Sequence, residues 1–284
     1  MFPGQGSQTV GMGKELAEAF PIAREVFEEI DEVLSHPLSR LMFEGPIDDL
    51  TLTANAQPAL MAVSMAIMRV LEKEGGLEIS SVAKFVAGHS LGEYSALAAA
   101  KSFSIADAAL VLRIRGTAMQ DAVPVGEGAM AAILGVDMDV ATVIAAEASE
   151  DGICSIANDN AVGQIVFSGT TSAITRAIEI AKKRGAKRSV LLPVSAPFHC
   201  AMMASAADVM AKELAAIVIG EPTVPLIANV IAEEKTEPNE IRELLVQQVT
   251  GRVRWRESIL FMKDNGVDTL IEVGAGKVLT GLTR

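Results

Sequence analysis

Short apolar runs alternate with longer stretches of helix-forming residues along most of the chain. At residues 81–88 the run SVAKFVAG is apolar and β-branched, which is typical of a buried strand. The stretch LGEYSALAAA at 91–100 is rich in helix formers and has no proline, so a helix is predicted there. Because strand and helix signals alternate in this way, the pattern predicts an α/β fold.

The middle of the chain has a different rhythm. Four strands and two helices are predicted there, at residues 129–136 (strand), 139–149 (helix), 153–158 and 164–169 (strands), 171–185 (helix) and 187–195 (strand). The order β-α-β-β-α-β is the split pattern of ferredoxin-like domains. We therefore expect a small domain over residues 123–196, inserted into a larger unit made of residues 1–122 and 197–284. A cleft between the two is the expected place for a site.

Composition excludes several classes of function. The chain has 284 residues, 50% of them hydrophobic, and its net charge of −12 argues against nucleic acid as a partner. Apolar runs such as 59–68 are too short to span a bilayer, so no membrane partner is expected. Cys154 and Cys200 lie far apart without metal-ligand spacing, so we predict no metal site and a reducing, cytoplasmic location.

The stretch GHSLG at residues 88–92 places one serine between two glycines where the predicted strand meets the predicted helix. This is the pattern of a nucleophile elbow, in which glycines give the backbone room for a sharp turn and the serine hydroxyl is exposed above a helix N-terminus. The five-residue pattern is weak alone, but its strand–turn–helix context makes Ser90 a candidate nucleophile.

A serine nucleophile needs a neighbouring base, and the chain has three histidines. His36 precedes a proline in a predicted loop, and His89 adjoins Ser90, where it is expected to shape the turn. His199 follows the last predicted strand of the small domain, where the chain re-enters the larger unit. We predict that His199 is the base, and a structural histidine is the alternative reading.

A serine hydrolase would add a carboxylate that orients the histidine. Asp151 and Asp159 lie between Ser90 and His199, but both fall in the inserted domain without a strand-end context. The sequence therefore predicts that this carboxylate is missing. A thioesterase or esterase that uses the same elbow remains the main alternative.

The segment AKKRGAKR at 181–188 is strongly basic on an otherwise acidic chain. Cations at a helix C-terminus complement its dipole, and Gly185 is a natural C-cap. The same charges could instead bind an anionic partner. The residues alone leave both readings open.

Several motifs together resemble one family. FPGQGSQ, GHSLGEYSAL, RGTAMQ, GAMAAILG, GQIVFSG, LPVSAPFHC and EVGAGKVLTGL are similar, essentially end to end, to malonyl-CoA:acyl carrier protein transacylases of fatty-acid synthesis. The resemblance implies a hydrolase-like α/β domain with a central, mostly parallel sheet and a ferredoxin-like insertion. It also implies an acyltransferase with a malonyl-serine intermediate, with coenzyme A thioester as substrate and no tightly bound cofactor.

The resemblance implies roles for five residues of the catalytic centre. Ser90 corresponds to the acylated nucleophile and His199 to its general base. The backbone carbonyl of Gln248 corresponds to the group that holds the histidine in place of a carboxylate. The backbone N–H groups of Gln5 and Leu91 correspond to the oxyanion hole. The family has a hydrophobic strand before FPGQG, whereas only Met1 and Phe2 precede Pro3 here, so the anchoring of Gln5 is in question.

Further positions are implied in substrate binding. Arg115 matches the residue that clamps the free carboxylate of malonate; without the family, an exposed helix residue like Arg113 is an equal reading. Phe198 is typical of malonyl-type transferases, and Asn160 and Gln164 are similar to positions that line the cleft.

Acyl carrier proteins are acidic, so Lys187 and Arg188 become candidate contacts for the carrier protein or for the phosphates of coenzyme A. The expected partners are malonyl-CoA and an acyl carrier protein. A non-catalytic module that docks carrier proteins is a second alternative, which intact Ser90 and His199 argue against.

Overall fold

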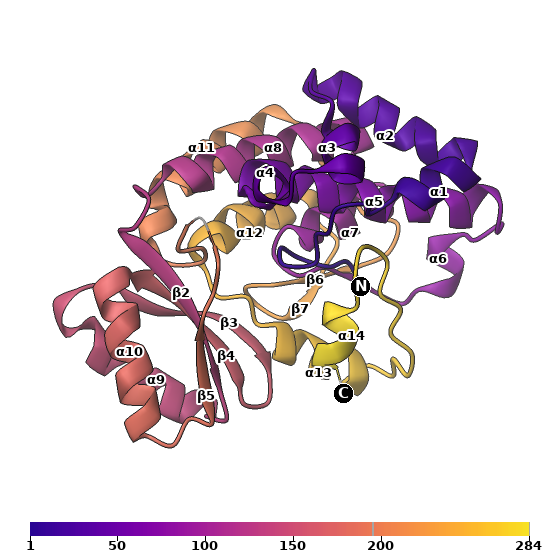
Figure 1. Cartoon of the computed structure of the whole chain (residues 1–284). Helices are drawn as coiled ribbons and strands as arrows, with labels where there is room; N and C mark the ends of the chain where they lie inside the picture. Colours follow the sequence, from indigo (N-terminus) through magenta and orange to yellow (C-terminus); the bar gives the residue numbers. More distant parts are fainter. Residues whose placement is uncertain (195, 284) are drawn as a thin grey trace.

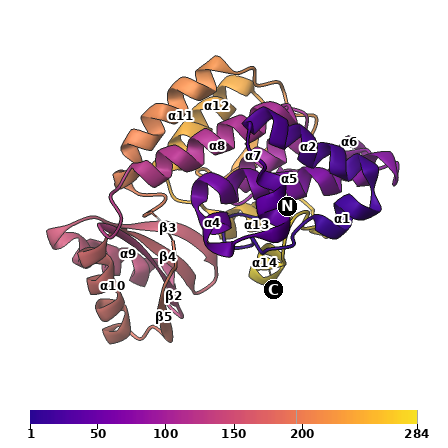
Figure 2. The same ribbon diagram turned by 45° about the horizontal axis from the view of Figure 1, so that its top comes forward.

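The computed structural model describes residues 1–194 and 196–283, and two views of it are given in Figures 1 and 2. The predicted α/β class is confirmed, with mixed sheets. The helices of the first part of the chain are α1 (Lys14–Ala19), α2 (Pro21–Leu34), α3 (Leu38–Glu44), α4 (Ile47–Thr51), α5 (Thr53–Lys73), α6 (Ile79–Val82), α7 (Gly92–Ala99) and α8 (Ile105–Asp121). The helices of the last part are the 3₁₀ helix η2 (Ala201–Met203) and α11 (Ala204–Ala216), α12 (Pro238–Thr250), α13 (Trp255–Asp264) and α14 (Val278–Leu282).

A small sheet lies at the centre of this larger unit. Its strands are β1 (Val86–Ala87), β6 (Leu226–Ala228) and β7 (Glu233–Lys235), in the order β1-β6-β7. β1 and β6 are parallel, whereas β6 and β7 are antiparallel. Phe2 extends the sheet beyond β1, because its N–H donates to Ala87 O at 2.9 Å and its carbonyl accepts from His89 N at 3.0 Å. The first residues are therefore anchored beside the strand that leads to Ser90.

The strand predicted at 81–88 is largely wrong. Only Val86 and Ala87 form a strand, and Ile79–Val82 is the short helix α6. The Ser81 hydroxyl donates to the Glu78 carbonyl at 2.7 Å, which favours a turn here, and Val82 is 66% exposed. An apolar run that is partly exposed gains little from pairing in a buried sheet.

Two helices of the larger unit pack closely enough to bring side chains of the site together. α5 is buried along most of its length, and α8 lies against it. Gly116 on α8 permits this approach, since a Cβ there would lie 2.5 Å from the carbonyl oxygen of Thr53. The consequence is that Arg115 on α8 reaches Gln57 on α5.

The middle of the chain forms a second layered unit. Its elements are β2 (Gly128–Leu134), α9 (Met138–Ala148), the 3₁₀ helix η1 (Ser149–Asp151), β3 (Cys154–Ala161), β4 (Gln164–Thr170), α10 (Thr171–Lys183) and β5 (Arg188–Leu191). The four strands form an antiparallel sheet in the order β3-β4-β2-β5. Ser195, the last residue of the strand predicted at 187–195, lies outside the described residues.

The two faces of this sheet have different neighbours. Ala131 and Ile133 of β2 pack in a separate apolar cluster with α9 and α10, which cover the face turned away from the larger unit (Figure 1). Met130 points to the opposite face because side chains alternate along a strand, and it packs with the core of the larger unit. Asp159 N also donates to Val253 O at 2.9 Å, which ties β3 to the larger unit.

Candidate active site

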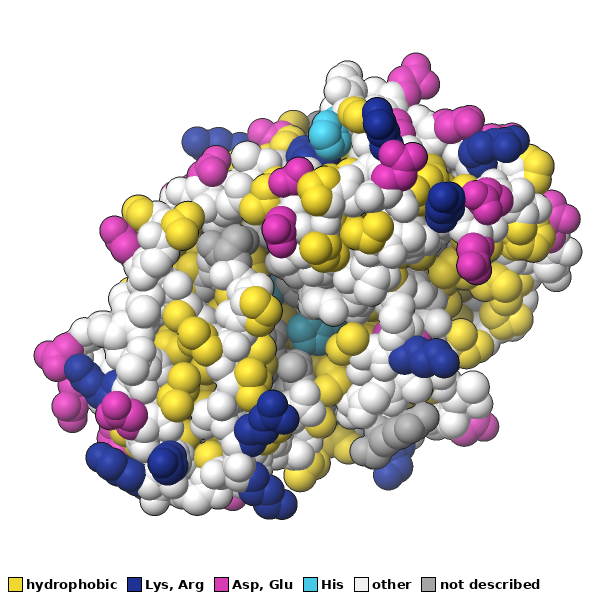
Figure 3. All heavy atoms as spheres, viewed as in Figure 1, with side chains coloured by type: hydrophobic (Ala, Val, Ile, Leu, Met, Phe, Trp, Pro, Cys, Tyr) yellow, Lys and Arg dark blue, Asp and Glu magenta, His cyan; other side chains and the backbone are white. Residues whose placement is uncertain are grey.

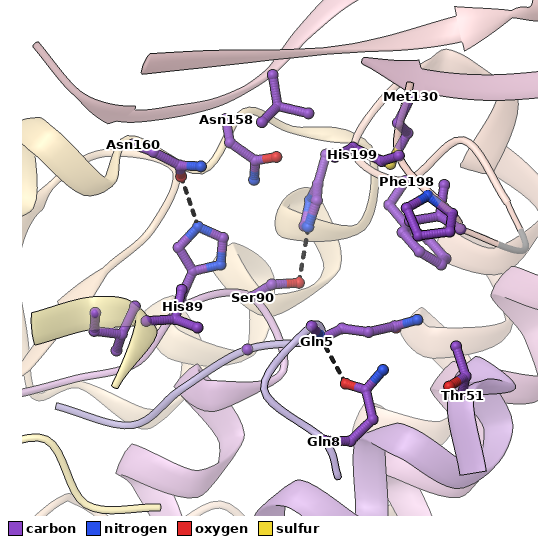
Figure 4. A pocket seen from close by; sticks show the side chains of 18 of the residues that line it. Gln5, Gln8, Thr51, His89, Ser90, Met130, Asn158, Asn160, Phe198 and His199 are labelled. Atoms are coloured by element: carbon purple, nitrogen blue, oxygen red, sulfur yellow. Dashed lines mark hydrogen bonds between the residues drawn. The ribbon is translucent and has the colours of Figure 1, made fainter. Parts of the chain in front are cut away.

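A cavity of about 670 Å³ lies between the two units (Figure 3). The larger unit contributes Gln5, His89, Ser90, Phe198 and His199 to its wall, and the smaller unit contributes Met130, Asn158, Asn160, Val166 and Leu192. Figure 4 shows Ser90 and His199 facing one another within it. The cleft expected between the units is therefore present, and it contains the predicted nucleophile and base.

Ser90 has the backbone geometry of a tight elbow. Its φ of 53° is left-handed, a conformation that costs a non-glycine residue free energy. Gly88 and Gly92 make the turn possible: a Cβ on Gly88 would lie 1.8 Å from Gly92 O, and one on Gly92 would lie 2.2 Å from Phe2 O. The two glycines are thus required by the close approach of three backbone segments.

His199 is in hydrogen-bond contact with Ser90. Its Nε2 lies 2.8 Å from Ser90 Oγ, while its Nδ1 lies 2.8 Å from the carbonyl oxygen of Gln248 and 3.1 Å from that of Gly251. Since carbonyls only accept, Nδ1 must carry the proton, and Nε2 is left free to accept the serine proton. No carboxylate contacts this imidazole among the described residues, so two backbone carbonyls fix its tautomer.

Burial keeps the imidazole neutral. His199 is 4% exposed, and burial, followed by the positive charge of Arg115, lowers its pKa from 6.5 to about 3. A neutral imidazole is the form that can accept a proton from the serine. The histidine is therefore ready to act as a base throughout the neutral pH range.

Arg115 lies directly beside the nucleophile. The residue is 1% exposed. Its guanidinium donates through Nη2 to Ser90 Oγ at 3.2 Å and to Gln248 Oε1 at 2.8 Å, and through Nη1 to Gln57 Oε1 at 2.6 Å. The reading of an exposed helix residue is therefore wrong. Its acceptors in the site are neutral, so the buried cation is in a position to bind an anionic group next to Ser90.

The N–H groups of Gln5 and Leu91 are free to bind an oxyanion, in that neither donates to an acceptor within the part of the chain that the structure describes. Leu91 directly follows the nucleophile, as the elbow geometry requires. The Gln5 side chain accepts from Thr53 Oγ1 at 2.8 Å, which helps to hold its loop. Together with the pairing of Phe2 beside β1, this anchors the segment that carries Gln5.

The binding residues predicted on the smaller unit differ in position. Asn160 lines the cavity, and its Oδ1 lies 2.8 Å from Nε2 of His89 (Figure 4). His89 in turn contacts Trp255. Phe198, which belongs to the larger unit, lines the cavity as well. Gln164 lies at the start of β4, and the structure does not bring it into the described cavity wall, whereas Val166 two residues later does contribute to it.

The basic segment lies outside the cavity. Lys187 and Arg188 are exposed, and neither has a carboxylate within 4.0 Å among the described residues, whereas Arg184 pairs with Glu147. Lys187 packs its stem against Gly135. Arg188 begins β5, and the chain that follows this strand, from Leu192 to Val194, lines the cavity.

Three buried polar residues were missed by the sequence analysis. Gln57 holds Arg115, as described above. Asn229 braces the elbow, because its Oδ1 accepts from Ser90 N at 2.8 Å and its Nδ2 donates to Gly88 O at 2.7 Å. Glu93 is 1% exposed and accepts from the Gln248 side chain. In the sequence, Gln57 and Asn229 look like ordinary helix or loop residues and belong to none of the motifs quoted above. Glu93 is the last residue of the motif GHSLGE, which drew attention to Ser90 and not to the glutamate.

No helix within residues 1–194 and 196–283 is long and apolar enough to cross a bilayer. The same ranges contain no group of three histidine, cysteine or acidic side chains that could hold a metal ion.

A serine elbow and a backbone-held histidine line one cleft, with a buried cation directly behind the serine, and this arrangement is the kind expected of a serine-dependent acyl-transferring site. The chain belongs to the acyl transferase domain family, whose model matches residues 1–283. It is 48% identical over 285 residues to the malonyl CoA-acyl carrier protein transacylase of Bacillus subtilis (strain 168), covering all of this chain and 88% of the relative. The malonyl CoA-acyl carrier protein transacylase of Escherichia coli (strain K12) is 46% identical, and the match covers all of this chain and 91% of that relative.

Solved structures agree with the sequence relatives. An acyl-carrier-protein-S-malonyltransferase from Bartonella henselae superposes with a TM-score of 0.98 at 60% identity, covering 100% of this chain and 90% of that chain. A malonyl-transacylase in complex with its type II PKS acyl-carrier protein superposes with a TM-score of 0.95 at 43% identity, covering 99% and 90%. The family resemblance stated from the motifs is confirmed.

Proposed function

We propose that this protein transfers a malonyl group from malonyl-CoA to the phosphopantetheine thiol of an acyl carrier protein, for fatty-acid synthesis. The observation that carries this function is the position of Arg115, whose Nη2 lies 3.2 Å from Ser90 Oγ. A buried cation beside the nucleophile favours an acyl group that carries its own carboxylate, which malonyl does and acetyl does not. The similarity to malonyl CoA-acyl carrier protein transacylases supports the same donor and acceptor.

The reaction proceeds in two half-reactions on Ser90. First, Ser90 Oγ attacks the thioester carbonyl while its proton passes to His199 Nε2, and the oxyanion forms against the N–H groups of Gln5 and Leu91. When the tetrahedral species collapses, the C–S bond breaks and His199 returns the proton to the sulfur of coenzyme A. The carrier-protein thiol then gives its proton to His199, attacks the malonyl ester and releases Ser90, which takes the proton back.

Arg115 supplies the selectivity in this mechanism. Its present acceptors, Gln57 and Gln248, are neutral amides, so a substrate carboxylate that binds the guanidinium adds the missing negative charge. An acyl group without a carboxylate leaves the buried cation unpaired, at a cost of about 3–5 kcal/mol. This difference separates malonyl from acetyl donors and gives the cation a use that a simple esterase would not have.

The domain organisation belongs to the same proposal. We assign residues 1–122 and 197–284 to a hydrolase-like unit and residues 123–196 to a ferredoxin-like unit. The strand order β3-β4-β2-β5 and the separate apolar cluster beneath α9 and α10 support this division. The catalytic groups then come from the first unit, and the second unit covers the cleft with Asn160 and its neighbours.

The carrier protein is proposed to approach along the exposed side of Lys187 and Arg188. Both cations are free of carboxylate partners in the described chain, and β5 leads from Arg188 towards the cavity wall. An acidic carrier protein or the phosphates of coenzyme A fit such a surface. The cytoplasmic location expected from the sequence stands as part of this proposal.

The function is tested by mixing the protein with malonyl-CoA and a holo acyl carrier protein and measuring both malonyl carrier protein and free malonate. We expect malonyl carrier protein to form in the native protein, and the Ser90→Ala and His199→Ala variants to lose at least about 10⁴-fold of this rate. Steady release of free malonate without transfer would instead identify a thioesterase. Binding of the carrier protein with no turnover would favour a docking module.

A further inference from the structure

Glu93 is a buried carboxyl group that the proposed mechanism does not use. It is the second residue of α7, three positions after Ser90, and its side chain is 1% exposed. Buried carboxyl groups are rare unless another group binds them. Its position beside the catalytic centre therefore requires an explanation.

The side chain of Gln248 connects Glu93 to Arg115. Gln248 Oε1 accepts from Arg115 Nη2 at 2.8 Å, and its Nε2 donates to Glu93 Oε2 at 2.6 Å and to Ser90 O at 3.0 Å. Because a guanidinium can only donate, the amide oxygen must face Arg115, and the amide nitrogen must then face an acceptor. Glu93 Oε2 is the nearest acceptor, at 2.6 Å against 3.0 Å for Ser90 O, so it is the main group that holds the amide of Gln248 in this orientation.

Gln248 also contacts the base through its backbone, since its carbonyl oxygen accepts from His199 Nδ1 at 2.8 Å. One residue of α12 thus joins the base, the cation and the buried carboxyl. The backbone carbonyl is held by the helix itself, whereas the side-chain amide depends on Glu93. A change at Glu93 should therefore act on Arg115 more than on His199.

We propose that Glu93 is a positioning residue that acts through Gln248 to hold the guanidinium of Arg115 for the substrate carboxylate, and that its ionised form competes with that carboxylate for the same cation. This inference rests on the proposed malonyl transfer. It concerns how strongly the site prefers a carboxylated acyl group, and Glu93 itself does not touch the reacting atoms.

The charges around Glu93 support this reading. Burial raises its pKa to about 8, against the opposing effects of its hydrogen bonds with Gln248 and Asn229 and of the charge on Arg115. Arg115 on α8 is the charged group that acts on Glu93, whereas Tyr94 on α7 stays neutral because burial raises its pKa to about 12. Glu93 is consequently mostly protonated at pH 7, and the charge of Arg115 is available. Above pH 8 two carboxylates, Glu93 and malonyl, would share one guanidinium.

The first test compares acylation of Ser90 by malonyl-CoA and by acetyl-CoA in the Glu93→Ala variant. With its nearest acceptor gone, the amide of Gln248 is held only by the longer bond to Ser90 O, and Arg115 is positioned less firmly. We expect malonyl acylation to fall about tenfold and acetyl acylation to fall much less. In an Arg115→Ala background the same change should leave the malonyl-to-acetyl ratio unaltered, because the group through which Glu93 acts is missing.

The second test follows the apparent KM for malonyl-CoA from pH 7 to pH 9.5 in the native protein and in Glu93→Gln, which keeps an acceptor for Gln248 but cannot ionise. We expect the native KM to rise about tenfold across this range and the variant KM to stay flat. Thermal melting of both variants checks that they fold.

The possible results separate two kinds of failure. If the native protein prefers malonyl but Glu93→Ala slows both donors equally, or if Glu93→Gln keeps the rise in KM, Glu93 is a structural residue and the inference is overturned. If the native protein shows no preference for malonyl-CoA, the proposed function fails before Glu93 is considered.

Discussion

The two walls of the cleft are built in different ways. On the larger unit, Ser90, Arg115 and His199 each have two or more defined partners, and Arg115 and His199 are almost completely buried. On the smaller unit, one face of an antiparallel sheet contributes Asn158 and Asn160 together with apolar side chains. One wall therefore fixes reacting groups, whereas the other shapes the space for the substrate.

This difference predicts separable effects. Substitutions on the larger unit should change the rate of acyl transfer or the preference among acyl groups, because those groups touch the reacting atoms. Substitutions on the smaller unit should mainly change the KM for the acyl donor or for the carrier protein. The predictions below test this separation, from the largest expected effect to the smallest.

Arg115→Ala should lower kcat/KM for malonyl-CoA by about 10²–10³-fold, because the malonyl carboxylate would be buried without its cation. Acetyl-CoA, which has no carboxylate, should lose far less. Arg113→Ala, two residues earlier on α8 and outside the catalytic contacts, is the matched control. Steady-state kinetics with both donors provide the measurement, and equal losses for malonyl and acetyl would contradict the assigned role.

Gly92→Ala should lower the melting temperature by about 5 °C or more, because the new Cβ cannot fit beside the backbone of Phe2. The required space is absent, since the Cβ would lie 2.2 Å from Phe2 O. Gly281→Ala is the control, as no heavy atom lies within 4 Å of a Cβ there. Similar melting temperatures for the two variants would show that the elbow tolerates a side chain.

Reversing both charges with Lys187→Glu and Arg188→Glu should raise the KM for carrier protein about tenfold and change the melting temperature little. The effect should weaken as salt is added, since both side chains are exposed. Lys212→Glu with Lys263→Glu makes the same charge change on exposed helices of the larger unit. An unchanged carrier-protein KM, or an equal rise in the control, would remove this surface from the docking site.

Asn160→Ala should raise the KM for malonyl-CoA about threefold to tenfold, since one hydrogen bond to His89 and part of the cavity wall are lost. The maximal rate should fall by a smaller factor than the KM rises. A hundredfold fall in kcat would show that Asn160 belongs with the reacting groups and would break the separation between the walls.

The pH dependence of acylation should show the smallest change. Because burial lowers the pKa of His199 to about 3, the imidazole stays neutral as pH falls through the usual histidine range. The acylation rate should therefore be nearly constant between about pH 5 and pH 7, a window below the ionisation of Glu93. An inflection near pH 6.5 in stopped-flow acylation would show that the base is exposed to solvent protons.

The sequence predicted the parts of the site that depend on local backbone geometry. The glycines around Ser90 and the position of His199 at the re-entry of the chain were readable because they follow from turn chemistry and element order. The residue pattern alone could not show that Arg115 is buried, because burial of this side chain depends on how closely α8 approaches α5. The resemblance to a family singled out Arg115 instead.

Other features could not be read from the chain. Glu93 and Asn229 acquire their partners from segments more than a hundred residues away, and a single sequence carries no signal for such pairing. The strand predicted at 81–88 failed for a related reason, because its burial was assumed from apolar composition. The helical preference of its first half is set by local hydrogen bonds to Glu78 instead.

The central claim is that Ser90 is acylated selectively because Arg115 binds the carboxylate of the donor. The most direct test is the intact mass of the protein after brief mixing with malonyl-CoA or with acetyl-CoA. We predict a malonyl adduct that is carried by Ser90, discharged by holo carrier protein, and not matched by an acetyl adduct in the same time. Equal acetylation, or release of malonate with no adduct, would contradict the claim.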